Sequence, residues 1–160
     1  MVATVGYLLY PNSASPAVGL SIGSVAPDFK LIDTESRTVT REALKGKPTF
    51  IFFTTSWCVP CQDGAKQLLK YDLETGGNTF HVLIVFVDPR ETEQQLREWK
   101  NSFSGKDWFA ALDRSGMASV YQVKYLDTKY VLDRNGVIRW TDIYPLAYEG
   151  AKKALQSLIG

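Results

Sequence analysis

Apolar and β-branched residues gather in short runs along the chain, and turn-forming residues separate these runs. Residues 49–55 (TFIFFTT) and 80–87 (FHVLIVFV) are continuous apolar stretches, which is typical of strands buried on both faces of a sheet. A shorter run at residues 107–112 predicts a third strand. These three segments are the candidates for the core of a central sheet.

Two further pairs of segments predict hairpins. Residues 26–32 alternate between apolar and polar positions, and a turn cluster separates them from a return strand at residues 37–40. Near the carboxyl end, residues 129–133 and 137–141 flank Asn135-Gly136, a dipeptide that favours the tight primed hairpin turn. We therefore expect one antiparallel pair near the start of the domain and another near its end.

Helical patterns lie between these strands. After residue 61, apolar residues recur at helical spacing until Gly76-Gly77-Asn78 ends the pattern. Further helical segments are predicted at residues 41–45, 91–101, 114–123 and 149–159. Strands that alternate with helices, with an antiparallel pair closing the sheet, predict an α/β sandwich around a central mixed sheet. We expect one domain at residues 23–160.

The first 22 residues have a different character. Residues 2–10 are mostly apolar, and the following residues 11–24 are rich in Pro, Ser, Gly and Ala, as in a linker. One interpretation is a first strand or a frayed tail. The other is the remainder of an anchor or signal, because a tethered extracytoplasmic domain would carry such an apolar piece and linker. We expect an extracytoplasmic, membrane-anchored protein, with a cytoplasmic location as the alternative.

Composition excludes several classes of protein. A chain of 160 residues is about one domain long, and its 45% apolar and 22% charged residues suit neither a disordered nor a membrane-embedded protein. The chain has 18 Lys and Arg residues and 17 Asp and Glu residues, and this near-balance of charge argues against a general nucleic-acid partner. We expect a monomer.

Cysteine usage points to redox chemistry. The two cysteines are Cys58 and Cys61, and the chain has a single histidine, so a structural zinc site with four Cys or His ligands is excluded. The pair follows a predicted buried strand and begins a predicted helix. A spacing of three on a first helical turn brings both sulfurs within reach of a disulfide, and the helix N-terminus favours the thiolate. Pro60 is tolerated in a first turn, where it stiffens the loop.

Several stretches together resemble the thioredoxin-fold thiol–disulfide oxidoreductases of the TlpA/ResA group. The matching stretches are Ala26-Pro-Asp-Phe29, Trp57-Cys-Val-Pro-Cys61, Tyr121-Gln-Val123 and Tyr130-Val-Leu-Asp-Arg-Asn-Gly136. The resemblance runs from about residue 23 to the end. It implies a thioredoxin-like three-layer sandwich with a four- or five-stranded sheet, an N-terminal β-hairpin extension and a central βα insertion. It also implies an exported or tethered protein that acts on the disulfides of other proteins.

The chain departs from this group where the group carries a cis-proline opposite the cysteines. That position is Asp127, followed by Thr128. A cis bond before a residue other than proline costs about 2.5–4 kcal/mol, so we expect a trans link. If Asp127 faces the thiols, it could repel the thiolate, accept a proton or bind a metal. Otherwise it is a solvated loop acid.

A second departure concerns the acids beside the thiols. Many members of the group have Glu three residues after the second cysteine and Pro two residues further on, whereas this chain has Gly64 and Lys66. The buried Asp that thioredoxins carry six residues before the first cysteine is replaced by Phe52. Asp63 is one residue out of step. Water, Asp63 or Asp127 could carry the proton instead, and we rank Asp127 first.

The leading hypothesis is a protein thiol–disulfide oxidoreductase that works as a reductant. Cys58 would attack a disulfide and Cys61 would resolve the mixed disulfide, with no cofactor beyond the Cys58–Cys61 pair. Trp57, Pro60, Asp127 and Thr128 are expected to contact the substrate or tune the thiols. Protein disulfides and an upstream thiol reductant would be its partners.

Two alternatives stay open. A thioredoxin-fold metal (copper) carrier or a non-catalytic docking module would use Cys58 and Cys61 with Asp127, and His81 is a weaker candidate ligand. A peroxide-reducing relative is the less favoured alternative, because the framing of a peroxidatic cysteine by Pro and Thr is not apparent.

Overall fold

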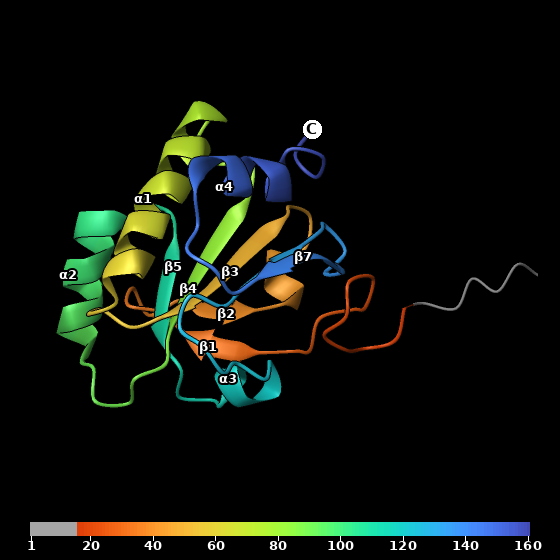
Figure 1. The fold of residues 1–160 in the computed structure, drawn as a ribbon. Coiled ribbons are helices and arrows are strands. Elements are labelled where there is room, and N and C mark those ends of the chain that lie inside the picture. Colours follow the sequence, from red (N-terminus) through yellow and green to blue (C-terminus); the bar gives the residue numbers. More distant parts are fainter. Residues whose placement is uncertain (1–15) are drawn as a thin grey trace, which may run out of the picture.

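The computed structural model describes residues 16–160. Its main sheet has five strands in the order β5-β4-β3-β6-β7, where β3, β4 and β5 run parallel while β6 and β7 are antiparallel to their neighbours (Figure 1). The strands are β3 (Thr49–Thr54), β4 (His81–Phe86), β5 (Phe109–Leu112), β6 (Lys129–Leu132) and β7 (Ile138–Asp142). This arrangement confirms the predicted α/β sandwich with a mixed sheet.

Alternating side chains divide the core into two layers. Phe50 and Phe52 on β3 join one buried cluster, which α1 (Val59–Glu74), α2 (Glu93–Phe103) and α4 (Tyr148–Leu155) complete. Ile51 and Phe53 point to the opposite face and join a second cluster. That face is covered by the hairpin of β1 (Lys30–Ile32) and β2 (Thr38–Thr40), the short helix η1 (Glu42–Leu44) and α3 (Met117–Val120). Because both faces are covered, β3 and β4 are apolar along nearly their whole length.

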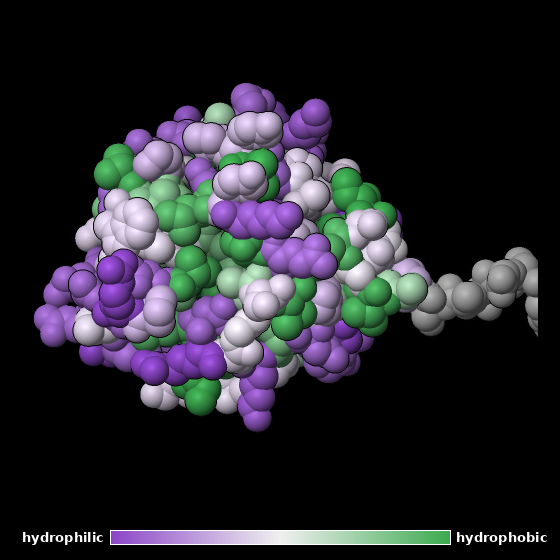
Figure 2. Space-filling view, turned by 60° about the horizontal axis from the view of Figure 1, so that its bottom comes forward, coloured by the Kyte–Doolittle hydropathy of each residue, from purple (hydrophilic) through white to green (hydrophobic). Residues whose placement is uncertain are grey.

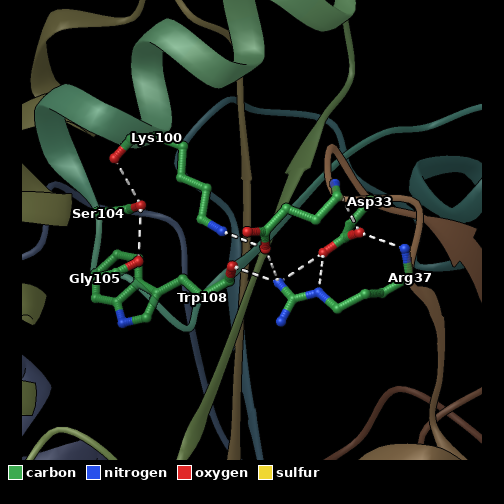
Figure 3. Close-up of polar contacts among 7 residues, drawn as sticks. Asp33, Arg37, Lys100, Ser104, Gly105 and Trp108 are labelled. Atoms are coloured by element: carbon green, nitrogen blue, oxygen red, sulfur yellow. Dashed lines mark hydrogen bonds and ion pairs between the residues drawn. The ribbon is translucent and has the colours of Figure 1, made fainter.

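The N-terminal hairpin forms a separate two-stranded sheet that polar contacts tie to the main domain. Asp33 accepts hydrogen bonds from the backbone N–H and side chain of Arg37, and Arg37 also donates to the carbonyl of Trp108 (Figure 3). Lys100 of α2 reaches Glu35 in the turn of the hairpin, with 2.9 Å between Nζ and Oε2. The expected hairpin extension is therefore fastened to α2 and to the segment before β5.

The carboxyl-terminal hairpin is present, but the predicted primed turn is wrong. A primed two-residue turn needs a positive φ at its first central residue, and in this loop only Gly136 has one, at φ 80°. The Gly136 N–H donates to the Asp133 carbonyl, which closes a turn over residues 133–136. The Asp133 carboxylate accepts the N–H groups of Asn135 and Val137. This side chain sets the turn and leaves the left-handed position to the glycine.

The helix predicted at residues 114–123 is also shorter than expected. Asp113 accepts hydrogen bonds from the N–H groups of Met117 and Ala118, so the helix begins at Met117 rather than at Arg114. Gln122 takes a left-handed conformation with φ 51°, which ends the helical path. The segment is therefore a single turn that packs under the sheet.

On the face seen in Figure 2, hydrophobic and hydrophilic residues are interspersed. Within residues 16–160, no helix combines the length and the hydropathy needed to cross a membrane. The apolar residues 2–10 lie outside the described residues, so their predicted alternatives stay predictions.

Candidate active site

The two cysteines form a disulfide where β3 gives way to α1. Cys58 is the N-cap of α1, and its Cα atom lies 5.2 Å from that of Cys61. Cys58 donates its N–H to the Thr55 carbonyl, which turns the chain tightly between strand and helix. Pro60 occupies the first turn of α1, as predicted. Both sulfurs therefore lie at the positive end of a 16-residue helix, where a thiolate is stabilised.

The two cysteines differ in exposure. Cys58 is 8% exposed, whereas Cys61 is completely buried and joins the cluster that contains Phe52 and Ala65. Trp57 and Val59 on either side of Cys58 are well exposed, Trp57 at 59%. An incoming disulfide can therefore approach Cys58 along an apolar rim, while Cys61 is shielded from it.

The loop that carries the disulfide is held by the segment between β4 and α2. The Ser56 N–H donates to Glu91 Oε1 over 2.6 Å, and Trp57 Nε1 donates to Asp88 Oδ2 over 3.2 Å. Hydrogen bonds from Arg90 hold the pKa of Asp88 well below its usual range, so Asp88 stays ionised. The Trp57 ring is thus fixed at the rim by a charged acceptor.

Sequence reasoning missed the part that Glu91 plays. Residues 91–93 suggested a simple helix start, but the N-cap of α2 is Thr92, which forms a capping box with Gln95. The Glu91 side chain turns away from this helix and toward Ser56, and it is 7% exposed. The available signal was topological: β3 and β4 are parallel, so the segments after them meet at one edge of the sheet.

Asp127 is not a solvated loop acid, and the interpretation that treated it as one is wrong. It is buried, and its loop is hydrogen-bonded to β3. The Asp127 N–H donates to the Phe53 carbonyl, and the Phe53 N–H donates to the Thr128 carbonyl. Thr128 is buried beside it and donates its hydroxyl to the Tyr125 carbonyl. All peptide bonds within residues 16–160 are trans, as expected for this position.

The backbone at Asp127 explains why no proline stands there. Its φ is +76°, in the left-handed region, whereas a proline ring fixes φ near −65°. Asp and Asn are among the few side chains that enter the left-handed region readily. The loop before β6 therefore follows a path that excludes the residue typical of the TlpA/ResA group.

The carboxylate of Asp127 is paired with a buried lysine. Its Oδ1 lies 3.0 Å from Nζ of Lys129, a side chain with no exposed surface. Burial raises the pKa of Asp127, and the neighbouring ammonium opposes that shift. A cation held on this oxygen disfavours a metal ion in the same place.

The positions of the missing acids are closed to solvent or turned away from the site. Phe52 is buried under α1, and a Cβ on Gly64 would lie 3.6 Å from Phe52 Cε2 and 3.2 Å from Leu146 Cβ. Asp63 is exposed on the outer side of the helix, as predicted. None of these three positions places a carboxylate under the disulfide.

A metal centre finds little support in this part of the chain. Within residues 16–160, no three His, Cys, Asp or Glu side chains gather where they could hold a metal ion. His81 begins β4, opposite Thr49, which is the end of β3 remote from the cysteines. Burial and the charge of Lys47 lower the pKa of this histidine.

Fold and site together define a thioredoxin-like thiol–disulfide oxidoreductase. A family model described as the AhpC/TSA family matches residues 22–141, and the chain belongs to that family.

The chain is also similar to individual relatives and to solved structures of this fold. It is 27% identical over 139 residues to the thioredoxin-like protein YneN of Bacillus subtilis, covering 87% of this chain and 81% of that protein. It is 27% identical over 159 residues to the thiol–disulfide oxidoreductase ResA of Geobacillus thermodenitrificans, covering 99% of this chain and 90% of that protein. A solved structure from Chlorobium tepidum, a putative thiol:disulfide interchange protein DsbE, superposes with a TM-score of 0.76 at 22% identity, covering 89% of this chain and all of that one. The resemblance to the TlpA/ResA group is confirmed.

Proposed function

We propose that this protein reduces disulfide bonds in other proteins, with Cys58 as the nucleophile and Cys61 as the resolving thiol. The observation that carries the proposal is the unequal exposure of the two cysteines at the start of α1, 8% for Cys58 and none for Cys61. The exposed residues Trp57 and Val59 beside Cys58 would contact the protein substrate.

The reaction has two exchange steps. The Cys58 thiolate attacks one sulfur of the substrate disulfide, so a Cys58–substrate bond forms and the other substrate sulfur leaves as a thiolate. Cys61 then loses its proton and attacks Cys58, which forms the Cys58–Cys61 bond and releases the second substrate thiolate. The substrate gains two electrons and the protein loses two. An upstream thiol reductant would return the protein to its dithiol form.

An extracytoplasmic location is part of the proposal. The apolar residues 2–10 and the Pro- and Ser-rich stretch after them support a tether outside the cytoplasm. A fusion of the full chain to a reporter that works only outside the cytoplasm tests the location.

The redox equilibrium tests the function. The purified protein is equilibrated with dithiothreitol and glutathione mixtures, and free thiols are counted by alkylation and mass. We expect a reversible two-electron transition near that of thioredoxin, about −270 mV, whereas a value near −120 mV would indicate an oxidant. Insulin reduction by the wild type, loss of it in Cys58→Ser, and a trapped mixed disulfide in Cys61→Ser would support the assignment of roles. Failure to form a reversible Cys58–Cys61 bond would contradict the proposal, and bound metal that blocks alkylation would favour the copper-carrier alternative.

A further inference from the structure

A cavity of about 400 Å³ lies between the turn of the N-terminal hairpin and the last turns of α2. Pockets that hold small molecules have volumes in this range. The charged residues of its wall are Glu35, Arg97, Lys100 and Lys106. Three cations and one carboxylate give the wall a formal charge of +2. A concave surface lined mainly by one sign of charge attracts ligands of the opposite sign.

Lys100 is the most deeply placed of these cations. Its side chain is 9% exposed, and its Nζ donates to Glu35 Oε2 over 2.9 Å (Figure 3). An ammonium has three donors. The bond to Glu35 is the one hydrogen bond that Lys100 Nζ makes among the residues that the structure describes. Two donors of a nearly buried ammonium therefore remain for a ligand in the cavity.

The carboxylate in the wall is already neutralised by two cations. Glu35 Oε2 pairs with Arg37 Nη2 over 2.7 Å as well as with Lys100. The hydrogen bond from Lys100 lowers the pKa of Glu35, so this carboxylate stays ionised at neutral pH. An anion that enters the cavity therefore meets a surplus of positive charge.

The other polar groups of the wall have no partner within residues 16–160. Arg97 and Lys106 are exposed, and neither forms an ion pair there. The Thr34 hydroxyl oxygen is buried without a hydrogen-bond partner in the same part of the chain. Lysine, arginine and threonine side chains all donate hydrogen bonds. The cavity thus offers several unused donors to one ligand.

We propose that this cavity binds a small molecule that carries a phosphate group. A phosphate monoester has a charge of about −1.5 to −2 at neutral pH and three strong acceptor oxygens, which match the charge of the wall and its unused donors. A single carboxylate would bring one charge and leave a cation unmatched. The phosphate oxygens would accept from Lys100 and Thr34, and the Arg97 guanidinium would supply a fork of two donors.

The cavity has no part in the cysteine chemistry. It lies at the end of α2, whereas Glu91, which holds the disulfide loop at Ser56, precedes the start of that helix. The inference therefore does not rest on the proposed function. A soluble phosphate ester and a lipid headgroup share the chemistry that the cavity recognises, and the experiment distinguishes these two sources.

Titrations of the oxidised protein test the site. Inorganic phosphate and glycerol 3-phosphate are added at constant ionic strength, and binding is followed by backbone amide NMR shifts. We expect saturable binding with the largest shifts at Thr34, Lys100 and Lys106. A flotation assay with phosphatidylglycerol vesicles is the second arm. Flotation that is lost in the same variants as ester binding would identify a lipid headgroup, and ester binding without flotation would identify a soluble ester.

Matched variants separate a built site from general charge. Arg97→Gln and Lys106→Gln should each raise Kd about fivefold, the effect of one partly exposed charge. Lys153→Gln removes an exposed cation of α4 outside the cavity and should leave Kd unchanged. None of these three side chains is buried, so the comparison does not depend on a variant that fails to fold.

The buried ion pair supplies a further comparison. Lys100→Met and Glu35→Gln both break this pair, but the first removes a donor from the site and the second removes its negative charge. We expect Lys100→Met to weaken binding and Glu35→Gln to tighten it. A purely structural role of the pair would weaken binding in both variants.

Three results would overturn the inference. The first is the absence of saturable binding up to about 10 mM of either phosphate compound. The second is a Lys153→Gln variant that loses as much affinity as Arg97→Gln. The third is a Glu35→Gln variant that binds as weakly as Lys100→Met.

Discussion

The contact between Glu91 and Ser56 predicts how firmly the disulfide loop is held. Glu91→Ala removes a buried acceptor 2.6 Å from the Ser56 N–H, and a hydrogen bond to a charged group contributes about 1.5–3 kcal/mol. Part of this loss is offset, because Glu91 Oε2 is buried without a hydrogen-bond partner among the described residues and its burial cost disappears. We expect a net loss of about 1.5 kcal/mol, which lowers Tm by about 3–6 °C for a domain of this size.

Thermal unfolding of the oxidised protein measures this loss. Glu91→Gln is the matched control, because its amide oxygen can still accept the Ser56 N–H, and we expect it to lose about half as much. The loosened loop should also slow the attack by Cys58 in Glu91→Ala more than in Glu91→Gln. An unchanged Tm in the Ala variant, or equal losses in both variants, would refute the reasoning that this hydrogen bond anchors the loop.

Three further variants probe buried polar groups. In Gly105→Ala the new Cβ would lie 2.5 Å from Trp108 Nε1 (Figure 3 shows Gly105 and Trp108). The indole would have to move and would lose its hydrogen bond to Asp72, so urea unfolding should show a free energy of unfolding lower by about 2–5 kcal/mol. Burial raises the pKa of Asp72, so stability falls as pH rises above 3.8, and Asp72→Asn should be more stable than the wild type at neutral pH but not in acid. The lowered pKa of Asp88 beside Arg90 gives stability that is present above pH 3.8 and lost only in strong acid, and urea unfolding of Asp88→Asn across the acid range should lack this dependence.

Most of the fold could be predicted because its signals are local. The continuous apolar runs of β3 and β4 reflect burial on both faces, and the spacing of apolar residues in α1 reflects one buried face. The Cys58–Cys61 site could be predicted for the same reason, since its chemistry is contained in four consecutive residues at the start of a helix. The turn type at residues 133–136 was predicted wrongly. The hydrogen bonds that the Asp133 side chain accepts select this turn and override the preference of Asn-Gly for a primed turn.

Contacts between distant segments could not be predicted in this way. Glu91 is 35 residues from Ser56, and nothing in its own neighbourhood marks it as an anchor. The burial of Lys129 is harder still to predict, because a lysine in a strand normally indicates a solvent-facing side chain. Only the backbone path at Asp127 and the carbonyl of Tyr144 turn it into a buried ammonium.

The departures from the TlpA/ResA group are physically linked to one another. Phe52 replaces an acid on β3, and a Cβ at position 64 of α1 would touch its ring at 3.6 Å and crowd Leu146 Cβ at 3.2 Å. A carboxylate in place of Phe52 would lie in an apolar cluster and would be costly to ionise there. The left-handed backbone before β6 excludes proline and admits Asp127, whose charge requires a buried partner and finds it in Lys129. An acid restored at position 64 alone should therefore cost stability, because its Cβ would lie 3.2 Å from Leu146 Cβ and Leu146 would have to move to accommodate it; urea unfolding of Gly64→Glu should show this loss.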